Sequence, residues 1–292
     1  MINLSGRAAI VTGAGSGLGR EHALLLASRG ARVVVNDLTQ TAADAVAAEI
    51  EAAGGVAIAI AASVTDFEAV KGMVAQTVAR WGRVDILINN AGILRDKTFA
   101  KMDLADFRLV VEVHLMGSVN CTKAVWDHMR AQNYGRIVMT TSSSGLYGNF
   151  GQSNYGAAKM ALVGLMQTLA LEGARNNIRV NCIAPTAATQ MLEGLLPQNE
   201  LDMLKPSSVS PGVLVLVGEN APTRTILCAG AGSFEAAHVT LTPGTFVGNG
   251  PDAPDLILAS WSKIVDRAGE FVPEDGKRQG RLEVENAAKG AS

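Results

Sequence analysis

A tyrosine and a lysine stand four residues apart in the segment GQSNYGAAKMALVGLMQTLALE, as Tyr155 and Lys159. On a helix, residues at this spacing lie on one face, one turn apart. A free phenol has a pKa of about 10, and a nearby ammonium group favours its ionised form. The pair could therefore exchange a proton with an alcohol or carbonyl oxygen, although the same spacing also occurs by accident on solvated helix faces.

Three serines precede this pair at the end of a predicted strand, in VMTTSSSG. Open parallel α/β sheets bind ligands at the carboxyl ends of their strands, so we expect these hydroxyls at the same edge as Tyr155. Ser142 could hydrogen-bond the oxygen that reacts with the tyrosine. Ser143 and Ser144 satisfy the same spacing argument and stay as alternatives.

A glycine-rich turn, IVTGAGSGLGRE, closes the first predicted strand and opens the first predicted helix. Gly13, Gly17 and Gly19 let the backbone turn sharply and approach a pyrophosphate, whose charge meets backbone amides and the helix N-terminus. Ser16 and Leu18 would line the same site. The spacing differs from the common GxGxxG fingerprint, and strand-to-helix turns also use glycine for steric reasons alone.

An acidic residue, Asp37, ends the next predicted strand, ARVVVND. A carboxylate at this place would accept hydrogen bonds from the adenosine ribose hydroxyls and repel a 2′-phosphate. No Arg or Lys occupies the neighbouring positions, Ser16 and Leu38, where a phosphate-binding base would be expected. The alternative role for Asp37 is the N-cap of the following helix. Together, the loop and the acid predict NAD rather than NADP as the cofactor.

The elements around these residues alternate between apolar strands and amphipathic helices. This order, repeated without a break, implies right-handed crossovers and a parallel sheet covered on both faces. The expected fold is therefore α/β, a single doubly wound, Rossmann-like parallel sheet with helices on both faces and a C-terminal extension. The strand-like runs are RAAIVTG, RVVVND, VAIAIAAS, DILINNAG, RIVMTTS and IRVNCIAP.

The last third of the chain has a different pattern. Residues 211–248 alternate short apolar runs with Gly and Pro, which favours a last strand and a hairpin. Residues 255–271 have the apolar spacing of a helix, and the charged EDGKRQGR after Pro273 is typical of a mobile or partner-supported end. We expect a Rossmann-fold domain over residues 1–250 and a C-terminal helical extension or tail over 251–292.

Composition argues against several classes of function. The 292 residues are 48% hydrophobic and carry a net charge of −2, so no basic surplus is present to bind a nucleic-acid backbone. The apolar runs are too short to span a bilayer, and the N-terminus lacks the features of a signal peptide, so a cytoplasmic location is expected. Cys121, Cys182 and Cys228 are isolated from one another, which predicts free thiols and no metal site.

Taken together, these motifs resemble the short-chain dehydrogenase/reductase family. The matching pieces are TGAGSGLG, NNAG, SSSGLYGNFGQSNYGAAK and NCIAP. The resemblance implies that Tyr155 is the general acid/base, that Lys159 binds the nicotinamide ribose and lowers the pKa of the tyrosine, and that Ser142 orients the substrate oxygen. It also implies a mobile substrate lid after Pro185, over residues 191–204. Further cofactor contacts would come from Asn90, Ala91, Gly92 and Pro185.

Two positions depart from the family's pattern. The acid usual at the end of the third strand is replaced by Ser63 and Val64, whose hydroxyl or amide could serve the adenine. The family's catalytic Asn, which holds a water in the proton relay behind the lysine, aligns with His114 in VEVHLMG. An imidazole can donate or accept a hydrogen bond in that place, and the alternative is a buried histidine with structural partners.

The histidine narrows the resemblance to one branch. NAGILRDKTFAKM, VHLMGSVNCTKAVWDHM and SGLYGNFGQSNYGAAK are similar to the dehydrogenase part of the peroxisomal multifunctional enzyme type 2 branch, also called 17β-hydroxysteroid dehydrogenase type 4. Enzymes of that branch oxidise (3R)-hydroxyacyl-CoA to 3-oxoacyl-CoA with NAD. The resemblance implies the same activity here, in a free-standing bacterial-type relative that forms a homodimer or homotetramer.

Other functions remain open. A 17β-hydroxysteroid or another bulky secondary alcohol would need the same chemistry, and the apolar residues among 146–150 suit either an acyl or a steroid body. A non-catalytic NAD-binding sensor or scaffold could be built on the same fold. A reductase acting on acyl carrier protein would favour NADPH, which Asp37 opposes. The phosphates of CoA would need surface cations, for which Arg95 and Lys97 are candidates.

Overall fold

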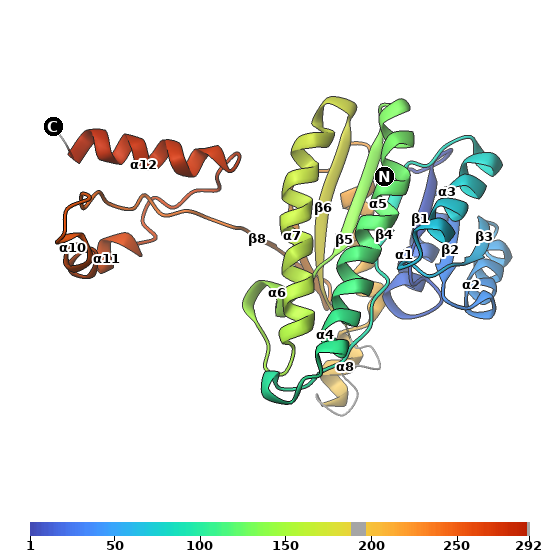
Figure 1. Ribbon diagram of the computed structural model, residues 1–292. Coiled ribbons are helices and arrows are strands. Elements are labelled where there is room, and N and C mark those ends of the chain that lie inside the picture. The colour runs from blue at the N-terminus through green and yellow to red at the C-terminus, as the bar shows by residue number, and fades with distance from the viewer. Residues whose placement is uncertain (188–196, 291–292) are drawn as a thin grey trace. The chain divides into compact units, whose positions relative to one another are not determined.

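The computed structural model describes residues 1–187 and 197–290. Eight strands form one sheet in the order β3-β2-β1-β4-β5-β6-β7-β8, and the neighbours from β3 to β7 are parallel (Figure 1). The expected doubly wound α/β fold is therefore confirmed. The strands are β1 (Ala8–Val11), β2 (Arg32–Asp37), β3 (Val56–Ala61), β4 (Ile86–Asn89), β5 (Gly135–Thr140), β6 (Ile178–Thr186), β7 (Ile226–Gly230) and β8 (Ser233–Ala237).

The central strands are buried because helices cover both faces of the sheet. Every residue of β1, β4 and β5 is buried, which matches their nearly continuous apolar sequences. Helix α1 packs against α2 and α9, while α3 packs against α5 and α4 against α7. The strand order reverses between β1 and β4, and a sheet of this kind binds ligands at that point, beyond the carboxyl ends of the strands.

The helices begin and end at residues suited to those places. In α3, the Asp66 side chain accepts a hydrogen bond from the Ala69 amide, and Gly82 ends the helix with a left-handed φ of 75°. The α-helices up to residue 217 are α1 (Gly17–Ser28), α2 (Gln40–Ala52), α3 (Phe67–Trp81), α4 (Leu104–Val111), α5 (Gly117–Ala131), α6 (Ser143–Tyr147), α7 (Ser153–Gly173), α8 (Gln198–Met203) and α9 (Ser210–Val217). Single turns of 3₁₀-helix cover Phe99–Lys101, Ala174–Asn176 and Pro206–Ser208, and a π-helix covers Glu112–Met116.

The chain divides into two compact units, Met1–Ala236 and Ala237–Ser292. The second unit contains α10 (Ala253–Ala259), α11 (Trp261–Ile264) and α12 (Lys277–Gly290), with an antiparallel bridge between Leu241 and Phe271. The charged segment after Pro273 thus contributes to a helix, although its composition suggested a mobile or partner-supported end. The predicted domain boundary at residue 250 stays a prediction. The two compact units meet earlier in the chain, between Ala236 and Ala237.

Neither a membrane-spanning helix nor a metal cluster is found within residues 1–187 and 197–290. No helix in those ranges is long and apolar enough to cross a bilayer. No three His, Cys, Asp or Glu side chains in the same ranges gather as metal ligands would. Cys121 and Cys182 are buried free thiols, and Cys228 is a half-buried free thiol.

A buried histidine makes the stability of the first unit sensitive to acid. His22 of α1 places Nδ1 2.8 Å from the Ser210 hydroxyl at the start of α9, and burial lowers the pKa of His22 from 6.5 to about 4. The unfolded chain therefore binds a proton below pH 6.5 that the folded chain does not bind until about pH 4. Stability falls as the pH is lowered through that window, by up to about 3 kcal/mol from this residue.

Urea unfolding at a series of pH values across this window tests the prediction, with His22→Gln as the comparison. The glutamine keeps a polar partner for Ser210 but does not titrate, so its free energy of unfolding should depend less steeply on pH. Equal slopes for wild type and variant would show that His22 is not the source of the acid sensitivity.

Candidate active site

Tyr155 and Lys159 lie on the first two turns of α7, with Lys159 almost fully buried. The Lys159 Nζ atom lies 5.4 Å from the centroid of the Tyr155 ring and donates a hydrogen bond of 2.5 Å to the carbonyl of Thr140, the last residue of β5. The ammonium group is therefore held by the backbone at the carboxyl end of the central strand. One turn of helix brings the phenol ring to the same edge.

Of the three serines after β5, Ser142 is the one whose hydroxyl meets Tyr155. Its hydroxyl interacts with that of Tyr155 and lowers the pKa of the tyrosine, and it accepts a hydrogen bond of 3.2 Å from the Ser144 amide. Ser143 is exposed, and the Ser144 hydroxyl donates to Gln152 Oε1 at 2.7 Å. The geometry thus separates the three candidates that spacing alone left equal.

Burial shifts the pKa of both members of the pair. It lowers the pKa of Lys159 from 10.5 to about 7, because an ammonium group surrounded by protein loses its hydration. It raises the pKa of Tyr155 above 10, while the hydrogen bond with Ser142 acts in the opposite direction and the Asp96 charge adds to the rise. Among the chain's own groups, burial therefore outweighs the lowering of the tyrosine pKa that the family resemblance implies for Lys159.

His114 lies beside this pair, in the π-helical turn between α4 and α5. Its ring meets the Tyr155 ring edge-on, with the centroids 5.2 Å apart and the planes at 86°. Its Nε2 lies 2.8 Å from the Ile93 carbonyl oxygen and 3.1 Å from the Ile93 amide nitrogen. The ring packs so closely on Gly92 that a Cβ there would lie 2.2 Å from the His114 Cε1 atom. Any residue with a Cβ atom at position 92 would collide with the His114 ring, so glycine is needed there.

The other ring nitrogen of His114, Nδ1, is buried and is unpaired within the part of the chain that the structure describes. Burial, together with the nearby Lys159 charge, lowers the pKa of His114 from 6.5 to about 3, so the imidazole is neutral at physiological pH. The Ile93 amide, at 3.1 Å, favours an unprotonated Nε2, and the Ile93 carbonyl, at 2.8 Å, favours a protonated one. We assign the proton to Nε2 because the carbonyl contact is shorter, and Nδ1 is then an acceptor.

The glycine loop has the shape that a dinucleotide cradle needs. Gly13 has φ +60° and approaches Ala91 so closely that a Cβ would lie 2.9 Å from its Cα atom. A Cβ on Gly19 would lie 2.1 Å from the Gly13 carbonyl oxygen. Ser16 precedes α1 without using its side chain as a cap, and Leu18 packs against the core. The loop therefore presents backbone rather than side chains to a ligand.

Asp37 closes the other side of this loop. Its carboxylate accepts hydrogen bonds from the amides of Gly15, at 2.9 Å, and Leu38, at 2.8 Å. The N-cap of α2 is Thr39, whose side chain accepts from the Ala42 amide, so the alternative role of Asp37 as the helix N-cap is wrong. Asp37 instead joins the end of β2 to the glycine loop, where an adenosine ribose would lie.

The remaining predicted cofactor residues lie at the ends of neighbouring strands. The Asn90 side chain donates to the carbonyls of Thr12 and Gly13 at 3.0 and 3.1 Å, and the Thr12 hydroxyl accepts from the amides of Asn90 and Ala91. These four hydrogen bonds join the segment after β4 to the glycine loop. Pro185 lies near the end of β6, paired with Ala229 of β7.

Two weaker candidates for contacts with the adenine, Ser63 and Val64, follow β3. The Ser63 hydroxyl lies 2.8 Å from the Thr65 hydroxyl, and the Val64 carbonyl accepts from Asn120 at 2.9 Å. The Ser63 hydroxyl is thus engaged by a residue two positions along the chain, and the Val64 carbonyl by a side chain of α5. Of the lid expected over 191–204, residues 191–196 lie outside the described residues, and part of the remainder forms α8.

Sequence reasoning missed a network that braces the site. The Gln152 side chain accepts from the Ser144 hydroxyl and donates to Asp96 Oδ2 at 2.7 Å. The buried Asn154 side chain donates to the Arg95 carbonyl at 3.0 Å and accepts from the Tyr155 amide at 2.7 Å. These residues link the loop after β4, the serine turn and the start of α7. No periodicity marks them, and only their position just before Tyr155 could have drawn attention to them.

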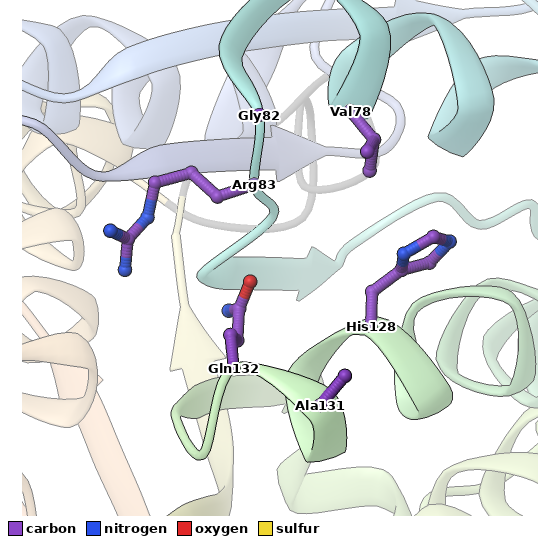
Figure 2. Close-up of a pocket in the computed structure, with 6 residues that line it drawn as sticks. All are labelled: Val78, Gly82, Arg83, His128, Ala131 and Gln132. Atoms are coloured by element: carbon purple, nitrogen blue, oxygen red, sulfur yellow. The ribbon is translucent and has the colours of Figure 1, made fainter.

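A surface hollow lies away from this site. Figure 2 shows side chains of the carboxyl ends of α3 and α5, with Arg83 between α3 and β4, around it. Gly82 and Gln132 precede the first residues of β4 and β5, so the hollow lies at the amino edge of the sheet. The catalytic candidates lie at the carboxyl edge, and we assign the hollow no part in the chemistry. Its lining residues are Val78, Gly82, Arg83, His128, Ala131 and Gln132.

The model of the short chain dehydrogenase family matches residues 7–200, which include the glycine loop and the Ser142, Tyr155 and Lys159 site. The chain belongs to the short-chain dehydrogenase/reductase family. It is therefore an enzyme of a family of NAD(P)-dependent oxidoreductases.

This short-chain dehydrogenase has long matches among known proteins. It is 47% identical over 278 residues to the peroxisomal multifunctional enzyme type 2 of Drosophila melanogaster, a match that covers 91% of the chain and 46% of that enzyme. The full-length structure of the Drosophila enzyme superposes with a TM-score of 0.84 and 41% identity, over 99% of the chain and 50% of the solved one. The chain thus spans about half the length of this relative.

Two other relatives are of similar size to the chain. A short-chain type dehydrogenase/reductase of Mycobacterium tuberculosis is 43% identical over 92% of the chain and 97% of its own length. A 7α-hydroxysteroid dehydrogenase, solved with NADH and 7-oxo-glycochenodeoxycholic acid, has a TM-score of 0.74 and 32% identity over 79% of the chain and 95% of its own. A free-standing dehydrogenase of this length is therefore an existing form of the family.

Proposed function

We propose that this short-chain dehydrogenase oxidises (3R)-hydroxyacyl-CoA to 3-oxoacyl-CoA with NAD. The observation that carries the proposal is that Tyr155 lies between the buried Lys159 and His114 and interacts with Ser142, in a chain that matches the multifunctional enzyme type 2 over 91% of its length. The family resemblance places His at the position of His114 in the (3R)-hydroxyacyl-CoA branch. The acid/base pair would serve no purpose in a protein that only senses NAD.

The residues around the glycine loop fit an NAD molecule. Added side-chain atoms at Gly13 and Gly19 would collide with Ala91 and with the Gly13 carbonyl, so only glycine permits the tight turn that would bring backbone amides to a pyrophosphate. Asp37 offers a carboxylate to the adenosine ribose hydroxyls and would repel the 2′-phosphate of NADP. NAD held there supplies the hydride acceptor and a positive charge at the carboxyl edge of the sheet.

Three side chains then divide the work on the substrate. Ser142 donates a hydrogen bond to the substrate oxygen and fixes its distance from Tyr155. Tyr155, as phenolate, accepts the hydroxyl proton while the hydride leaves the carbinol carbon. Lys159 stabilises the phenolate by its charge and holds the ribose of the cofactor. The pKa of the lysine, near 7, lets it pass a proton on at physiological pH.

We assign His114 a place in the path of that proton. The unpartnered Nδ1 would accept a hydrogen bond from a water molecule beside Lys159, as the amide of the family's Asn does. His114→Ala removes this acceptor and the edge-on support of the Tyr155 ring, and we expect kcat to fall about 10- to 100-fold. His114→Asn restores an acceptor and should recover most of the loss.

Steady-state kinetics with NAD saturating would measure the effect on kcat. Thermal unfolding of each variant gives the control for stability. Equal kcat values for wild type and His114→Ala, with both proteins folded, would show that the histidine serves packing alone.

A hydroxysteroid is the second candidate substrate, favoured by the similarity to the 7α-hydroxysteroid dehydrogenase. A 17β-hydroxysteroid or another bulky secondary alcohol would use the same side chains in the same roles. Action on acyl carrier protein with NADPH is opposed by the Asp37 carboxylate. We also propose a homodimer or homotetramer, no nucleic-acid partner and a cytoplasmic location, on the grounds of family likeness, net charge and sequence pattern respectively.

Initial rates of NADH formation distinguish these substrates. A (3R)-hydroxyacyl-CoA, its (3S) enantiomer and a 17β-hydroxysteroid would each be tested with NAD and with NADP. The proposal predicts turnover of the (3R) thioester with NAD that exceeds every other combination. Turnover of the steroid alone would keep the roles of Tyr155 and Lys159 but overturn the substrate.

A further inference from the structure

Two cations stand on the loop after β4 and share a single carboxylate. The Arg95 Nε atom lies 3.8 Å and the Lys97 Nζ atom 3.2 Å from the carboxylate of Asp106 in α4. The side chains of Arg95 and Lys97 are 49% and 51% exposed. Two positive charges against one negative charge leave the group with a surplus of one. A second anion can therefore approach from solvent.

The acid between the two cations does not cancel this surplus. Asp96 turns its carboxylate to Gln152, which donates to it at 2.7 Å. Successive side chains of an extended segment point to opposite sides, and residues 95 and 97 both reach Asp106. The cation pair and the acid thus face different neighbours.

The backbone of this loop is fastened to the start of the catalytic helix. The Asn154 side chain donates to the Arg95 carbonyl at 3.0 Å, and the Lys97 amide donates to the Gly151 carbonyl at 2.9 Å. Asn154 is fully buried and also holds the amide of Tyr155. The backbone that carries both cations is therefore held in place relative to the residue that takes the substrate proton.

We propose that Arg95 and Lys97 bind the phosphate groups of the CoA part of the substrate. This assignment rests on the proposed function, since it requires a CoA thioester. The planar guanidinium group can contact two phosphate oxygens at once, and the lysine adds a point charge beside it. Asp106 holds both side chains in place and competes with the phosphates for them. The hydroxyacyl end then reaches Tyr155 while the nucleotide end stays at the surface.

The test compares two substrates that differ only beyond the thioester. One is a (3R)-hydroxyacyl-CoA, and the other is the N-acetylcysteamine thioester of the same acid, which has no phosphate. The Arg95→Ala/Lys97→Ala variant should raise KM for the CoA substrate about tenfold or more and leave kcat near its wild-type value. Its KM for the short thioester should stay within about twofold of wild type, because no contact is lost.

The chain offers a matched control for the loss of two charges. Lys71 and Arg130 are 51% and 56% exposed, and each is paired with one carboxylate on its own helix. Lys71→Ala/Arg130→Ala should leave both KM values unchanged. Asp106→Asn removes the competing carboxylate and should lower KM for the CoA substrate.

A direct titration with CoA itself supplies a readout that does not depend on turnover. Wild type should bind CoA more tightly at low salt than at high salt, because charged contacts at the surface are screened. The Arg95→Ala/Lys97→Ala variant should bind CoA about tenfold more weakly than wild type and the control.

The outcomes separate this proposal from the proposed function. Equal rises in KM for both thioesters would mean that the loop shapes the site without touching phosphate, and unchanged values for both would place the phosphates elsewhere; either result overturns the proposal. Failure of wild type to oxidise any thioester would overturn the proposed function. The CoA titration would then decide alone, and equal CoA binding by wild type and variant would overturn the phosphate site.

Discussion

We expect the Tyr155→Phe variant to oxidise alcohol about 10³-fold more slowly than wild type, with NADH binding within about twofold of wild type. The substitution removes one oxygen, the atom that receives the substrate proton, and leaves the ring that packs against His114. The phenylalanine also lacks the hydroxyl that interacts with Ser142. Its ring still fills the site, so the loss should appear in kcat and not in the folding of the chain.

Pre-steady-state formation of NADH, compared with fluorescence titration of NADH, separates the chemical step from binding. Tyr134→Phe is the matched control, because it removes the same atom from a residue that immediately precedes β5, at the amino edge of the sheet. Turnover of Tyr155→Phe at the wild-type rate would contradict the assigned mechanism.

The second large effect concerns the choice of cofactor. We expect Asp37→Ser combined with Leu38→Arg to lower kcat/KM for NAD about 100-fold and to raise it for NADP by a similar factor. The change removes the carboxylate that would repel a 2′-phosphate and adds a guanidinium group to bind it. Leu38 is 69% exposed, so an arginine fits there without disturbing the core.

Initial rates with each cofactor at a fixed, saturating substrate concentration measure this switch. Asp37 also accepts the Gly15 amide, so Asp37→Asn shows how much of the effect comes from the shape of the loop. Asp44→Ser on α2 removes the same charge away from Asp37 and should leave the preference unchanged. An unaltered preference in the double variant would mean that Asp37 does not face the adenosine ribose.

The sheet and its helices were predictable because their periodicity is local. All six apolar runs identified in the sequence are strands, β1 to β6. Their order in the sheet could not be predicted in the same way, because right-handed crossovers restrict the possible orders without choosing one. The segment Ser210–Val217 is less typical, since its β-branched residues form α9. Pro211 at its start suits the first turn of a helix.

The contacts of the site could be predicted only in part. Tyr155 and Lys159 share a helix face, and that relation is contained in their spacing. The choice of Ser142 over Ser144 depends on Gln152, which takes the Ser144 hydroxyl through a contact that no periodicity encodes. The π-helical turn that aims His114 at Tyr155 is likewise set by packing on Gly92. The C-terminal segment was harder still to predict from the sequence. Its helix α12 is polar and has no buried face, so no apolar periodicity marks it.

We propose above that this chain transfers a hydride from a (3R)-hydroxyacyl-CoA to NAD. A single-turnover experiment, with enzyme in excess over substrate, would measure NADH by its absorbance and 3-oxoacyl-CoA by chromatography. The proposal predicts that the two products appear together in equal amounts, and that neither appears with the (3S) enantiomer. Tight binding of NADH without formation of either product from any alcohol would contradict it and identify the chain as a binding protein.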